Sequence, residues 1–283
     1  MSLRGQTYVV TGATSGIGQA MAAELSRRGA RVAIVGRNQA KLGASAAAIG
    51  GDVDVFLADL SLVSEVKRLA RELNDSYDHI DVLINNAGIH SFTSATTSEG
   101  YDEMVATNHF APFVLTNLVL DTLQAAPAPR VVVTSSEAHR LAGRIDLDRL
   151  AQPGEYAAFS SFRAYGNTKL LNVLFAQELA RRTEGTGLTA NSMCPGTVNT
   201  GLFTGHQPFS AIVGALSHSP VVRTPEQGAR MGMKLATDPA LANVSGEFLT
   251  ATPGLRFLPR VPARRDAELQ RRLWERTAEL TGL

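Results

Sequence analysis

The sequence predicts a single α/β domain in which a mostly parallel sheet is covered by helices. Short apolar runs rich in branched residues alternate with helix-forming stretches, which is the pattern of buried parallel strands joined by helices. A glycine-rich turn joins the first apolar run to the first helical stretch. No repeat or long linker divides the 283 residues, so one domain over residues 1–283 is expected.

Five short apolar runs are the expected strands. Their branched side chains fit a sheet that is buried on both faces. Helical stretches separate them, so consecutive strands are expected to be parallel. The runs cover residues 8–10, 32–35, 53–57, 82–84 and 131–133.

The first strand leads into a glycine-rich turn, Thr11 to Gly18, and then into a helix from about Gln19. Glycines let backbone N–H groups approach a pyrophosphate, and the first turn of a helix offers unpaired donors to an anion. A phosphate is therefore expected at Gly16 to Gly18. Glycines alone also fit an ordinary turn, and the spacing is Gly-x-x-x-Gly-x-Gly instead of the commonest dinucleotide pattern, Gly-x-Gly-x-x-Gly.

Tyr165 and Lys169 lie four residues apart, which places both side chains on one face of a helix. A phenol is a poor acid or base near neutral pH, because its ordinary pKa is about 10. A lysine cation beside it favours the phenolate and lowers that pKa. The pair therefore indicates a proton-transfer site, although so short a pattern also arises by chance.

Four motifs occur in an order that resembles the short-chain dehydrogenase/reductase family. They are Thr11 to Gly18, Asn85-Asn86-Ala87-Gly88, Tyr165 to Lys169 and Pro195-Gly196. The resemblance covers nearly the whole chain, and the stretches around the motifs are similar to the retinol dehydrogenase-like branch. It implies a Rossmann-type fold, with a doubly wound parallel sheet and helices on both faces, and a nicotinamide cofactor.

The resemblance implies a catalytic set of Asn108, Ser136, Tyr165 and Lys169. Tyr165 would give its proton to a carbonyl oxygen, or take it from an alcohol in the reverse direction. Lys169 would bind the nicotinamide ribose and lower the pKa of the phenol, and Ser136 would hydrogen-bond the substrate oxygen. Asn108 would hold a water linked to Lys169. Ser135 competes with Ser136, but the second serine of the pair aligns with the family.

The expected cofactor is NADP(H). The second strand ends Gly36-Arg37-Asn38, where an NAD site usually carries an acid, and Arg37 can pair with a 2′-phosphate. The alternative is that Arg37 is a surface arginine without this role. Asp59 resembles the family residue that meets the adenine amino group, although in an unrelated chain it would cap a helix. The residues implied in cofactor binding are Gly12, Thr14, Ser15, Gly16, Ile17, Gly18, Arg37, Asn38, Asp59, Leu60, Asn85, Ala87, Gly88, Tyr165, Lys169, Pro195, Gly196, Val198 and Thr200.

Two segments are expected to shape the substrate site. Ser136 and Tyr165 are 29 residues apart (165 − 136), about twice the usual family spacing, so an insertion at about residues 139–162 is expected to border the substrate mouth. A lid at about residues 201–224 contains apolar side chains that favour a hydrophobic ketone, aldehyde or alcohol, although core packing also explains some of them. His139 could contact the substrate, but a lone histidine in a loop is expected to be solvated.

Composition argues against several other classes. A net charge of +1 argues against a nucleic-acid surface, and the arginine-rich residues 260–276 also contain acids and are expected to form a solvated helix face. Cys194, the single cysteine, is expected to be a packed thiol and not a nucleophile. The six histidines lack metal-ligand spacing, so no metal is expected. No stretch approaches 18 consecutive apolar residues, so a cytoplasmic enzyme without membrane contact is expected.

The leading hypothesis is an NADP(H)-dependent ketoreductase or alcohol dehydrogenase for a hydrophobic small molecule. One alternative is a sensor that binds NADP(H) without chemistry, against which the intact Tyr165 and Lys169 argue. Another is an enzyme that reduces a C=C bond in the manner of protochlorophyllide reductase, which shares these motifs. The resemblance implies a homodimer or homotetramer, in which residues 104–123 and 163–181 would form helices that pair between subunits.

Overall fold

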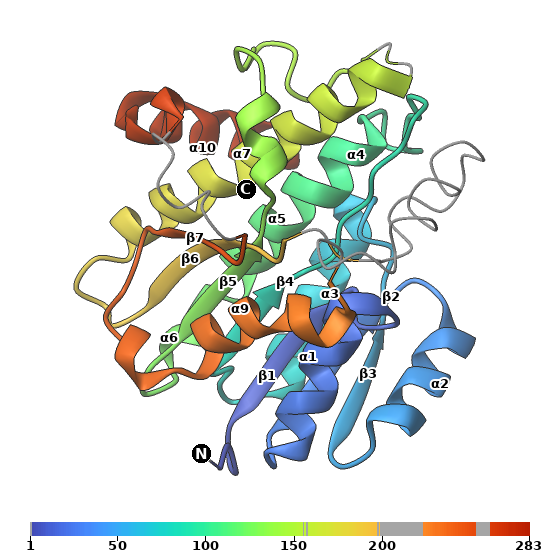
Figure 1. Cartoon of the computed structure of the whole chain (residues 1–283), viewed down its shortest axis with the longest axis vertical. Coiled ribbons are helices and arrows are strands. Elements are labelled where there is room, and N and C mark those ends of the chain that lie inside the picture. Colours follow the sequence, from blue (N-terminus) through green and yellow to red (C-terminus); the bar gives the residue numbers. More distant parts are fainter. Residues whose placement is uncertain (1, 155, 157, 197, 199–222, 253–260) are drawn as a thin grey trace.

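A seven-stranded parallel sheet forms the centre of the molecule (Figure 1). The computed structural model describes residues 2–283 except 155, 157, 197, 199–222 and 253–260. The strand order is β3-β2-β1-β4-β5-β6-β7, so the direction of winding reverses between β1 and β4. In open sheets of this kind, ligands bind beyond the carboxyl ends of the strands near such a reversal. The strands are β1 (Thr7–Thr11), β2 (Arg31–Gly36), β3 (Val53–Leu57), β4 (Val82–Asn85), β5 (Arg130–Thr134), β6 (Thr189–Cys194) and β7 (Phe248–Thr250).

The five apolar runs lie within β1 to β5, as predicted. Strands β6 and β7 are not among those that the sequence predicts. β6 has the sequence TANSMC, whose polar residues conceal a strand, although all six residues are buried. Its neighbours β5 and β7 pair with it on either side, so its burial comes from the sheet and not from its own hydrophobicity.

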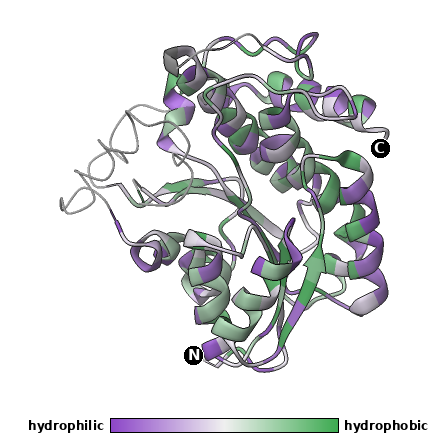
Figure 2. Cartoon of the chain, turned by 90° about the vertical axis from the view of Figure 1, so that its right-hand side faces the viewer, coloured by the Kyte–Doolittle hydropathy of each residue, from purple (hydrophilic) through white to green (hydrophobic). Residues whose placement is uncertain are grey.

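Helices cover both faces of the sheet and pack around two apolar cores. Helices α1, α2 and α9 contribute Met21, Leu42 and Met233 to one core, while α3, α5, α7 and α10 contribute Leu69, Phe113 and other apolar side chains to the other. Figure 2 shows the hydrophobic residues along the strands and the inner sides of the helices. The bounds are α1 (Gly16–Arg27), α2 (Gln39–Ile49), α3 (Val63–Ser76), α5 (Ala111–Leu118), α7 (Ala158–Arg182), α9 (Pro225–Thr237) and α10 (Ala267–Thr281).

The helix expected at residues 104–123 is interrupted. It consists of α4 (Glu103–Val105), a π-helical segment η1 (Ala106–Phe110), α5 and α6 (Leu120–Gln124). A π-helical turn is wider than an α-helical one and often occurs at a functional site. Here it holds Asn108 and His109, both of which are fully buried.

Helix α10 packs against α5 and α7 (Figure 1). The ring of Trp274 meets Phe113 edge-on, with centroids 4.8 Å apart, and stacks on Phe175 at 5.8 Å. The guanidinium of Arg182 lies 4.5 Å from the centre of the Trp274 ring. Helix α5 lies within one of the segments expected to pair between subunits, and α7 contains the other. Within one chain, α10 therefore already covers part of that surface.

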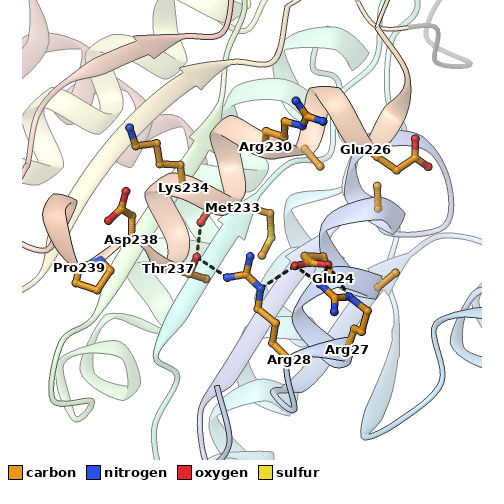
Figure 3. A pocket seen from close by; sticks show the side chains of 13 residues that line it. Glu24, Arg27, Arg28, Glu226, Arg230, Met233, Lys234, Thr237, Asp238 and Pro239 are labelled. Carbon is orange, nitrogen blue, oxygen red and sulfur yellow. Dashed lines mark hydrogen bonds and ion pairs between the residues drawn. The ribbon is translucent and has the colours of Figure 1, made fainter. Parts of the chain in front are cut away.

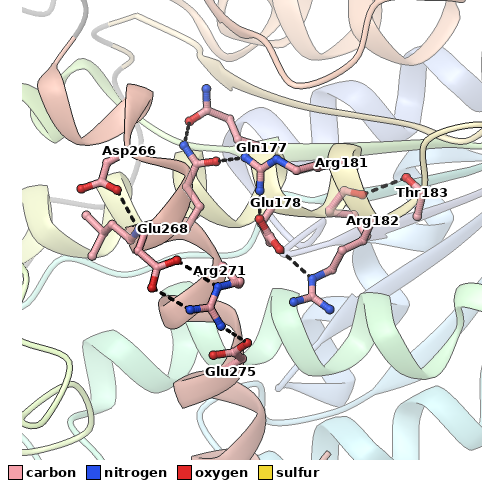
Figure 4. A network of polar contacts seen from close by, with 12 residues as sticks. Gln177, Glu178, Arg181, Arg182, Thr183, Asp266, Glu268, Arg271 and Glu275 are labelled. Carbon is pink, nitrogen blue, oxygen red and sulfur yellow. Dashed lines mark hydrogen bonds and ion pairs between the residues drawn. The ribbon is translucent and has the colours of Figure 1, made fainter.

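Polar contacts join α7 to α10 on the outer side of this packing (Figure 4). Gln270 is buried, and its oxygen accepts a hydrogen bond from Arg181 at 2.5 Å while its nitrogen donates to Gln177 at 3.2 Å. Glu178 is also buried and pairs with Arg181 and Arg182. These contacts satisfy polar groups that the packing of α10 removes from water.

The expectation of a solvated face at residues 260–276 is correct for Arg271 and wrong for Arg264. Arg271 is exposed and pairs with Glu268 and Glu275. Arg264 has a relative exposure of 6%. Its guanidinium lies 4.9 Å from the centre of the Phe248 ring, and this cation–π contact favours its burial.

Candidate active site

The glycine-rich turn lies between β1 and α1. Gly12 and Gly16 have φ angles of 67° and 57°, a left-handed conformation that favours glycine. Gly18 has no room for a side chain, because a Cβ there would lie 2.4 Å from the carbonyl oxygen of Gly12. Ser15 is the N-cap residue of α1, but its side chain makes no capping hydrogen bond. The N–H groups of the first turn of α1 therefore remain available to an anion.

Arg37 and Asn38 follow β2 close to this turn. A Cβ on the preceding residue, Gly36, would lie 2.8 Å from Cγ2 of Thr14. The side chains of Arg37 and Asn38 are exposed, and Oδ1 of Asn38 accepts a hydrogen bond from the backbone N–H of Lys41 at 3.0 Å. Asn38 therefore caps α2, and Arg37 lies at the surface beside the glycine-rich turn.

Asp59 follows β3 and makes a local turn. Its Oδ1 accepts hydrogen bonds from the backbone N–H of Ser61 at 2.9 Å and from the Ser61 hydroxyl at 2.7 Å. Helix α3 begins later, with Leu62 as its N-cap residue, so Asp59 is not the cap. Leu60 is buried. Contact of Asp59 with an adenine amino group stays a prediction.

The segment after β4, Asn86 and Ala87, is hydrogen-bonded to the end of β1. The backbone N–H groups of Asn86 and Ala87 both donate to Oγ1 of Thr11 at 3.0 Å, and Nδ2 of Asn86 donates to the carbonyl of Thr11 at 3.0 Å. Asn85 donates to Oγ1 of Thr116 at 2.9 Å and so holds β4 against α5. These hydrogen bonds fix the two strand ends that flank the reversal of the sheet.

Asn108 holds the chain directly after Gly88. Its Oδ1 accepts from the N–H of Ile89 at 2.7 Å, and its Nδ2 donates to the carbonyl of Ile89 at 2.9 Å and to Oγ1 of Thr168 at 3.0 Å. A Cβ on Gly88 would lie 3.1 Å from Nζ of Lys169 and 3.2 Å from Oδ1 of Asn108. Glycine at this position therefore lets three predicted site residues approach one another.

Tyr165 and Lys169 lie on one side of α7, as their spacing predicts. Both side chains are buried, and Nζ of Lys169 lies 5.4 Å from the centre of the Tyr165 ring. Nζ also donates a hydrogen bond to the carbonyl of Thr134 at 3.2 Å. Burial lowers the pKa of Lys169 from 10.5 to about 8, because the charged form loses its contact with water.

The pKa of Tyr165 is raised from its usual value, whereas the sequence predicts that Lys169 lowers it. Burial is the largest cause, Cys194 raises the pKa further, and a hydrogen bond with Ser136 lowers it. Nζ of Lys169 lies over the ring and donates to the carbonyl of Thr134. Desolvation of the phenolate therefore outweighs the opposing contributions here.

The two serines after β5 have different contacts. Ser135 is buried, and its hydroxyl donates to the backbone carbonyl of Lys169 at 2.7 Å. Ser136 caps a 3-10 helix, η2 (Glu137–Leu141), with its Oγ accepting from the N–H of Ala138 at 3.1 Å, and it lowers the pKa of Tyr165. Ser136 is therefore the hydroxyl next to the phenol, whereas Ser135 joins β5 to α7.

His139 is fully buried, so the expectation that it is solvated is wrong. Its Nδ1 lies 2.8 Å from the carbonyl of Ser136, and its ring meets Phe248 edge-on at a centroid distance of 4.7 Å. Burial lowers its pKa, which favours the neutral imidazole. The residue that covers it comes from β7, far away in the sequence and not predicted as a strand.

The segment after β6 returns to the glycine-rich turn. Gly196 has a φ of 86°, and Val198 is buried. A Cβ on Gly228 of α9 would lie 2.6 Å from Cγ2 of Val198 and 3.2 Å from Cγ1 of Ile17. Close packing at Gly228 therefore brings Val198 beside the first turn of α1. Pro195 and Cys194 are buried, as predicted for this thiol, while Thr200 and residues 201–222 of the expected lid lie outside the described residues.

Comparison with known proteins identifies the family of this chain. A family model described as short chain dehydrogenase matches residues 6–145. Over 289 aligned residues, the chain is 40% identical to dehydrogenase/reductase SDR family member 13 of Bos taurus, and the match covers 100% of this chain and 74% of that protein. This chain belongs to the short-chain dehydrogenase/reductase family.

Other relatives of this dehydrogenase/reductase agree with the predicted branch and fold. It is 35% identical to human retinol dehydrogenase 13, with 100% of this chain and 86% of that protein covered. A crystal structure of an uncharacterized protein from Mycobacterium paratuberculosis has a TM-score of 0.78 and 32% identity, covering 99% of this chain and 95% of that chain. A Pseudomonas aeruginosa RhlG/NADP complex has a TM-score of 0.71 and 27% identity, covering 89% and 97%. The Rossmann-type fold and the oxidoreductase class follow.

This dehydrogenase/reductase contains a cluster of aromatic rings that was not predicted from the sequence. His90 lies at the centre, with ring centroids 4.6 Å from Phe92, 4.9 Å from Phe162 and 5.1 Å from Tyr165. Its Nε2 lies 3.2 Å from Oγ of Ser161. Phe162 precedes Tyr165 by one helical turn, and that spacing is the signal that predicts a shared face. The cluster forms an apolar wall beside the predicted proton donor.

An open groove with a volume of about 730 Å³ lies elsewhere, between α1 and α9 (Figure 3). Arg28 spans the two helices by hydrogen bonds to Glu24 and Thr237, while Arg230 and Lys234 lie along one rim. None of the predicted site residues lines this groove. It is therefore separate from the candidate active site.

The described residues contain neither a metal-binding cluster nor a helix that could span a membrane. No group of three or more histidine, cysteine, aspartate or glutamate side chains in that part of the chain is arranged to hold a metal ion. Within the same residues, no helix is both long and apolar enough to span a bilayer.

Proposed function

We propose that the chain is an NADP(H)-dependent oxidoreductase that transfers a hydride between the nicotinamide and a hydrophobic ketone, aldehyde or alcohol. The observation that carries this proposal is the convergence of Tyr165, Lys169, Asn108 and Gly88 beyond the carboxyl ends of β4 and β5. Reduction is the favoured direction, because cells usually keep NADP reduced. The family membership supports the general class, and the choice of cofactor and substrate is our inference.

The residues of the glycine-rich turn fit a dinucleotide. Gly12, Gly16 and Gly18 leave a turn free of side chains, and the N-terminus of α1 offers donors to a pyrophosphate. Gly88 leaves open the space in front of Lys169. The other residues that we infer to contact the cofactor are Thr14, Ser15, Ile17, Asp59, Leu60, Asn85, Ala87, Pro195, Gly196, Val198 and Thr200.

Arg37 supports the choice of NADP(H). It is exposed beside the turn and can form charge-assisted hydrogen bonds with a 2′-phosphate. Two solved relatives were obtained with this cofactor, the RhlG/NADP complex and a short chain dehydrogenase from Escherichia coli CFT073 complexed with NADPH. An acid at this position would instead repel the phosphate.

In the proposed reaction, the bound cofactor supplies or accepts the hydride. Tyr165 donates its phenolic proton to the carbonyl oxygen during reduction and takes a proton from the alcohol during oxidation. Ser136 hydrogen-bonds the same substrate oxygen as its charge develops. Lys169 provides a positive charge when protonated, and Asn108 holds the backbone against which Lys169 packs.

The raised pKa of Tyr165 keeps the phenol protonated at neutral pH, so it holds the proton that reduction consumes. A positive charge on Lys169 would favour release of that proton. The ring cluster of His90, Phe92 and Phe162 supports an apolar substrate, because these side chains surround one side of the phenol. A hydrophobic ketone or aldehyde matches such a wall.

The test is the loss of absorbance of reduced nicotinamide when NADPH, or NADH in parallel, is mixed with apolar ketones, aldehydes, quinones and activated alkenes. Conversion of a carbonyl compound to its alcohol, with NADPH preferred, is the expected result. Product mass and structure identify the bond that is reduced. Reduction of alkenes alone would replace the proposal with C=C chemistry, and tight NADPH binding without any turnover would replace it with a sensor.

A further inference from the structure

The first turn of α3 is capped by a carboxylate from a residue 36 positions after it begins. Its N-cap residue, Leu62, has no polar side chain, and the backbone N–H groups of Val63 and Ser64 donate instead to Glu99, to Oε2 at 2.6 Å and to Oε1 at 3.0 Å. Partial burial alone would raise the pKa of Glu99, but the hydrogen bonds from the start of α3 and the charge of Lys67 lower it. Glu99 is therefore a charged cap for donors that the helix leaves unpaired.

The turn that carries Glu99 is held by other contacts. The N–H of Thr97 donates to the carbonyl of Tyr101 at 2.8 Å. The hydroxyl of Tyr101 donates to the carbonyl of Leu280 in α10 at 2.7 Å, and its ring meets the fully buried Phe110 edge-on, with centroids 5.3 Å apart. The position of Glu99 is therefore set by its own turn, and loss of its carboxylate would act mainly on α3.

The start of α3 continues directly from the residues that we infer to contact the adenine. Asp59 and Leu60 follow β3, and the N–H of Leu62 donates to the carbonyl of Asp59 at 3.2 Å. Two residues separate Leu60 from Val63, where the contact with Glu99 begins. Because an uncapped first turn frays, the backbone that leads into α3 loses its fixed position when the cap is removed.

Two helices beside the proposed cofactor site differ in how their first turns are satisfied. At α1, Ser15 makes no capping hydrogen bond, which leaves donors for a pyrophosphate. At α3, Glu99 already accepts from the N–H groups of Val63 and Ser64. The start of α1 is therefore open to an anion, whereas the start of α3 is closed and contributes a fixed backbone.

We propose that Glu99 is a positioning residue for the adenosine end of the cofactor, because it fixes the start of α3 and with it residues 59–62. The proposal rests on the proposed function for the contact of Asp59 and Leu60 with the adenine. It assigns a role to a residue that lies outside the four sequence motifs.

The first experiment measures binding of adenosine 2′,5′-bisphosphate, which has the adenosine end of NADP(H) without the nicotinamide, by titration calorimetry. Glu99→Gln keeps the size of the side chain but places an amide nitrogen, a donor, against a backbone N–H. It should raise the dissociation constant about 5- to 20-fold, roughly the effect of one lost hydrogen bond, and raise KM for NADPH similarly. Its kcat at saturating NADPH should fall by no more than about twofold, because the phenol and its neighbours are unchanged.

Ser98→Ala is the matched control, since Ser98 precedes Glu99 in the same turn and is exposed. It should bind adenosine 2′,5′-bisphosphate as the wild type does. Unchanged affinity in folded Glu99→Gln, or an equal loss in Ser98→Ala, would overturn the proposal.

The second measurement, hydrogen exchange of the wild type, decides the proposal even if Glu99→Gln fails to fold. Saturation with adenosine 2′,5′-bisphosphate should slow exchange at the amides of Val63 and Ser64, because a ligand that holds residues 59–62 also stabilises the capped turn. Exchange in α10, which contributes none of the predicted site residues, should stay the same. No response at Val63 and Ser64 with the ligand bound would overturn the proposal.

The outcomes separate this proposal from the proposed function. If the wild type binds adenosine 2′,5′-bisphosphate but turns over no substrate, the proposed enzymatic function fails, while both measurements still decide the role of Glu99. If the wild type binds neither this compound nor NADPH, both proposals fail.

Discussion

At the scale of single residues, the site combines the phenol of Tyr165 and the amino group of Lys169, and both side chains are buried. Burial raises the pKa of Tyr165 and lowers that of Lys169 to about 8, so desolvation favours the neutral form of each. The two effects leave Tyr165 with its proton at neutral pH and bring Lys169 close to its own titration. Both shifts give consequences that can be measured.

Tyr165→Phe should reduce turnover by at least about 100-fold, because it removes the proton donor and leaves the ring. NADPH binding should be retained, which fluorescence titration of the reduced nicotinamide measures. Tyr8→Phe is the matched control, since Tyr8 is also buried but lies in β1 with its hydroxyl bonded to Gln6 at 2.9 Å. Full turnover by Tyr165→Phe would remove Tyr165 from the mechanism.

Lys169→Met should raise the melting temperature of the cofactor-free protein at pH 7. The pKa of Lys169 is 10.5 when exposed and about 8 when folded, so the unfolded state holds more protons between these pH values. Stability therefore rises with pH through that window, and the full cost of burying the charge, about 3 kcal/mol, applies below it. The advantage of Lys169→Met should be present at pH 7 and shrink toward pH 10. Thermal unfolding measured at both pH values would refute this if the variant melts lower at pH 7.

At the scale of elements, α10 packs against α5 and α7 and contributes to the apolar core that it shares with these helices and α3. Its Leu273 is buried, and its Trp274 meets rings from α5 and α7. Because α5 follows directly on the π-helical segment that holds Asn108, packing of α10 supports the segment as well as covering it. Pairing of these helices between subunits, in a homodimer or homotetramer, stays a prediction.

Leu273→Ala should lower the free energy of unfolding by about 2–5 kcal/mol, because it leaves a cavity where α10 meets the core. Glu275→Ala, two residues along the same helix, should change it by no more than about 0.5 kcal/mol, since Glu275 is exposed. Urea unfolding of both variants measures the difference. Similar values for the two would show that α10 contributes little to the core.

At the scale of the whole molecule, the parallel sheet brings distant segments to one edge. The turn after β1, Arg37 after β2 and Gly88 after β4 converge there because parallel strands end on the same side. A ligand that bridges these ends should stabilise the entire domain, because binding to the folded state alone shifts the unfolding equilibrium.

NADPH should therefore raise the melting temperature more than NADH does at the same concentration. At 100 times its dissociation constant, a ligand adds about 2.7 kcal/mol to the free energy of unfolding. Arg37→Asp should remove most of the advantage of NADPH while leaving stabilisation by NADH. Thermal shift measurements at matched concentrations give both values. Equal losses for the two cofactors would mean that Arg37 does not read the 2′-phosphate.

Local patterns predicted much of this fold, and long-range contacts account for what they missed. Valine-rich runs identified β1 to β5 because those residues are apolar by themselves, whereas β6 is buried by its neighbours. The spacing of Tyr165 and Lys169 correctly placed both on one side of α7, but could not show that Nζ turns to Thr134. The sequence predicts a solvated His139 because Phe248, which covers it in the structure, lies more than 100 residues later in the chain. The remaining site roles are still predictions.

Oγ1 of Thr277 in α10 lies 3.1 Å from Nε2 of His109, and this contact joins residues 168 positions apart, which has a consequence during translation. A ribosome completes the glycine-rich turn, Asn108, Tyr165 and Lys169 before it begins α10. A nascent chain can therefore assemble the nucleotide-facing strands while His109 still lacks its hydroxyl partner. Synthesis therefore separates two events in time, because the strand ends around the glycine-rich turn are made early and the α10 side chain that contacts His109 is made late.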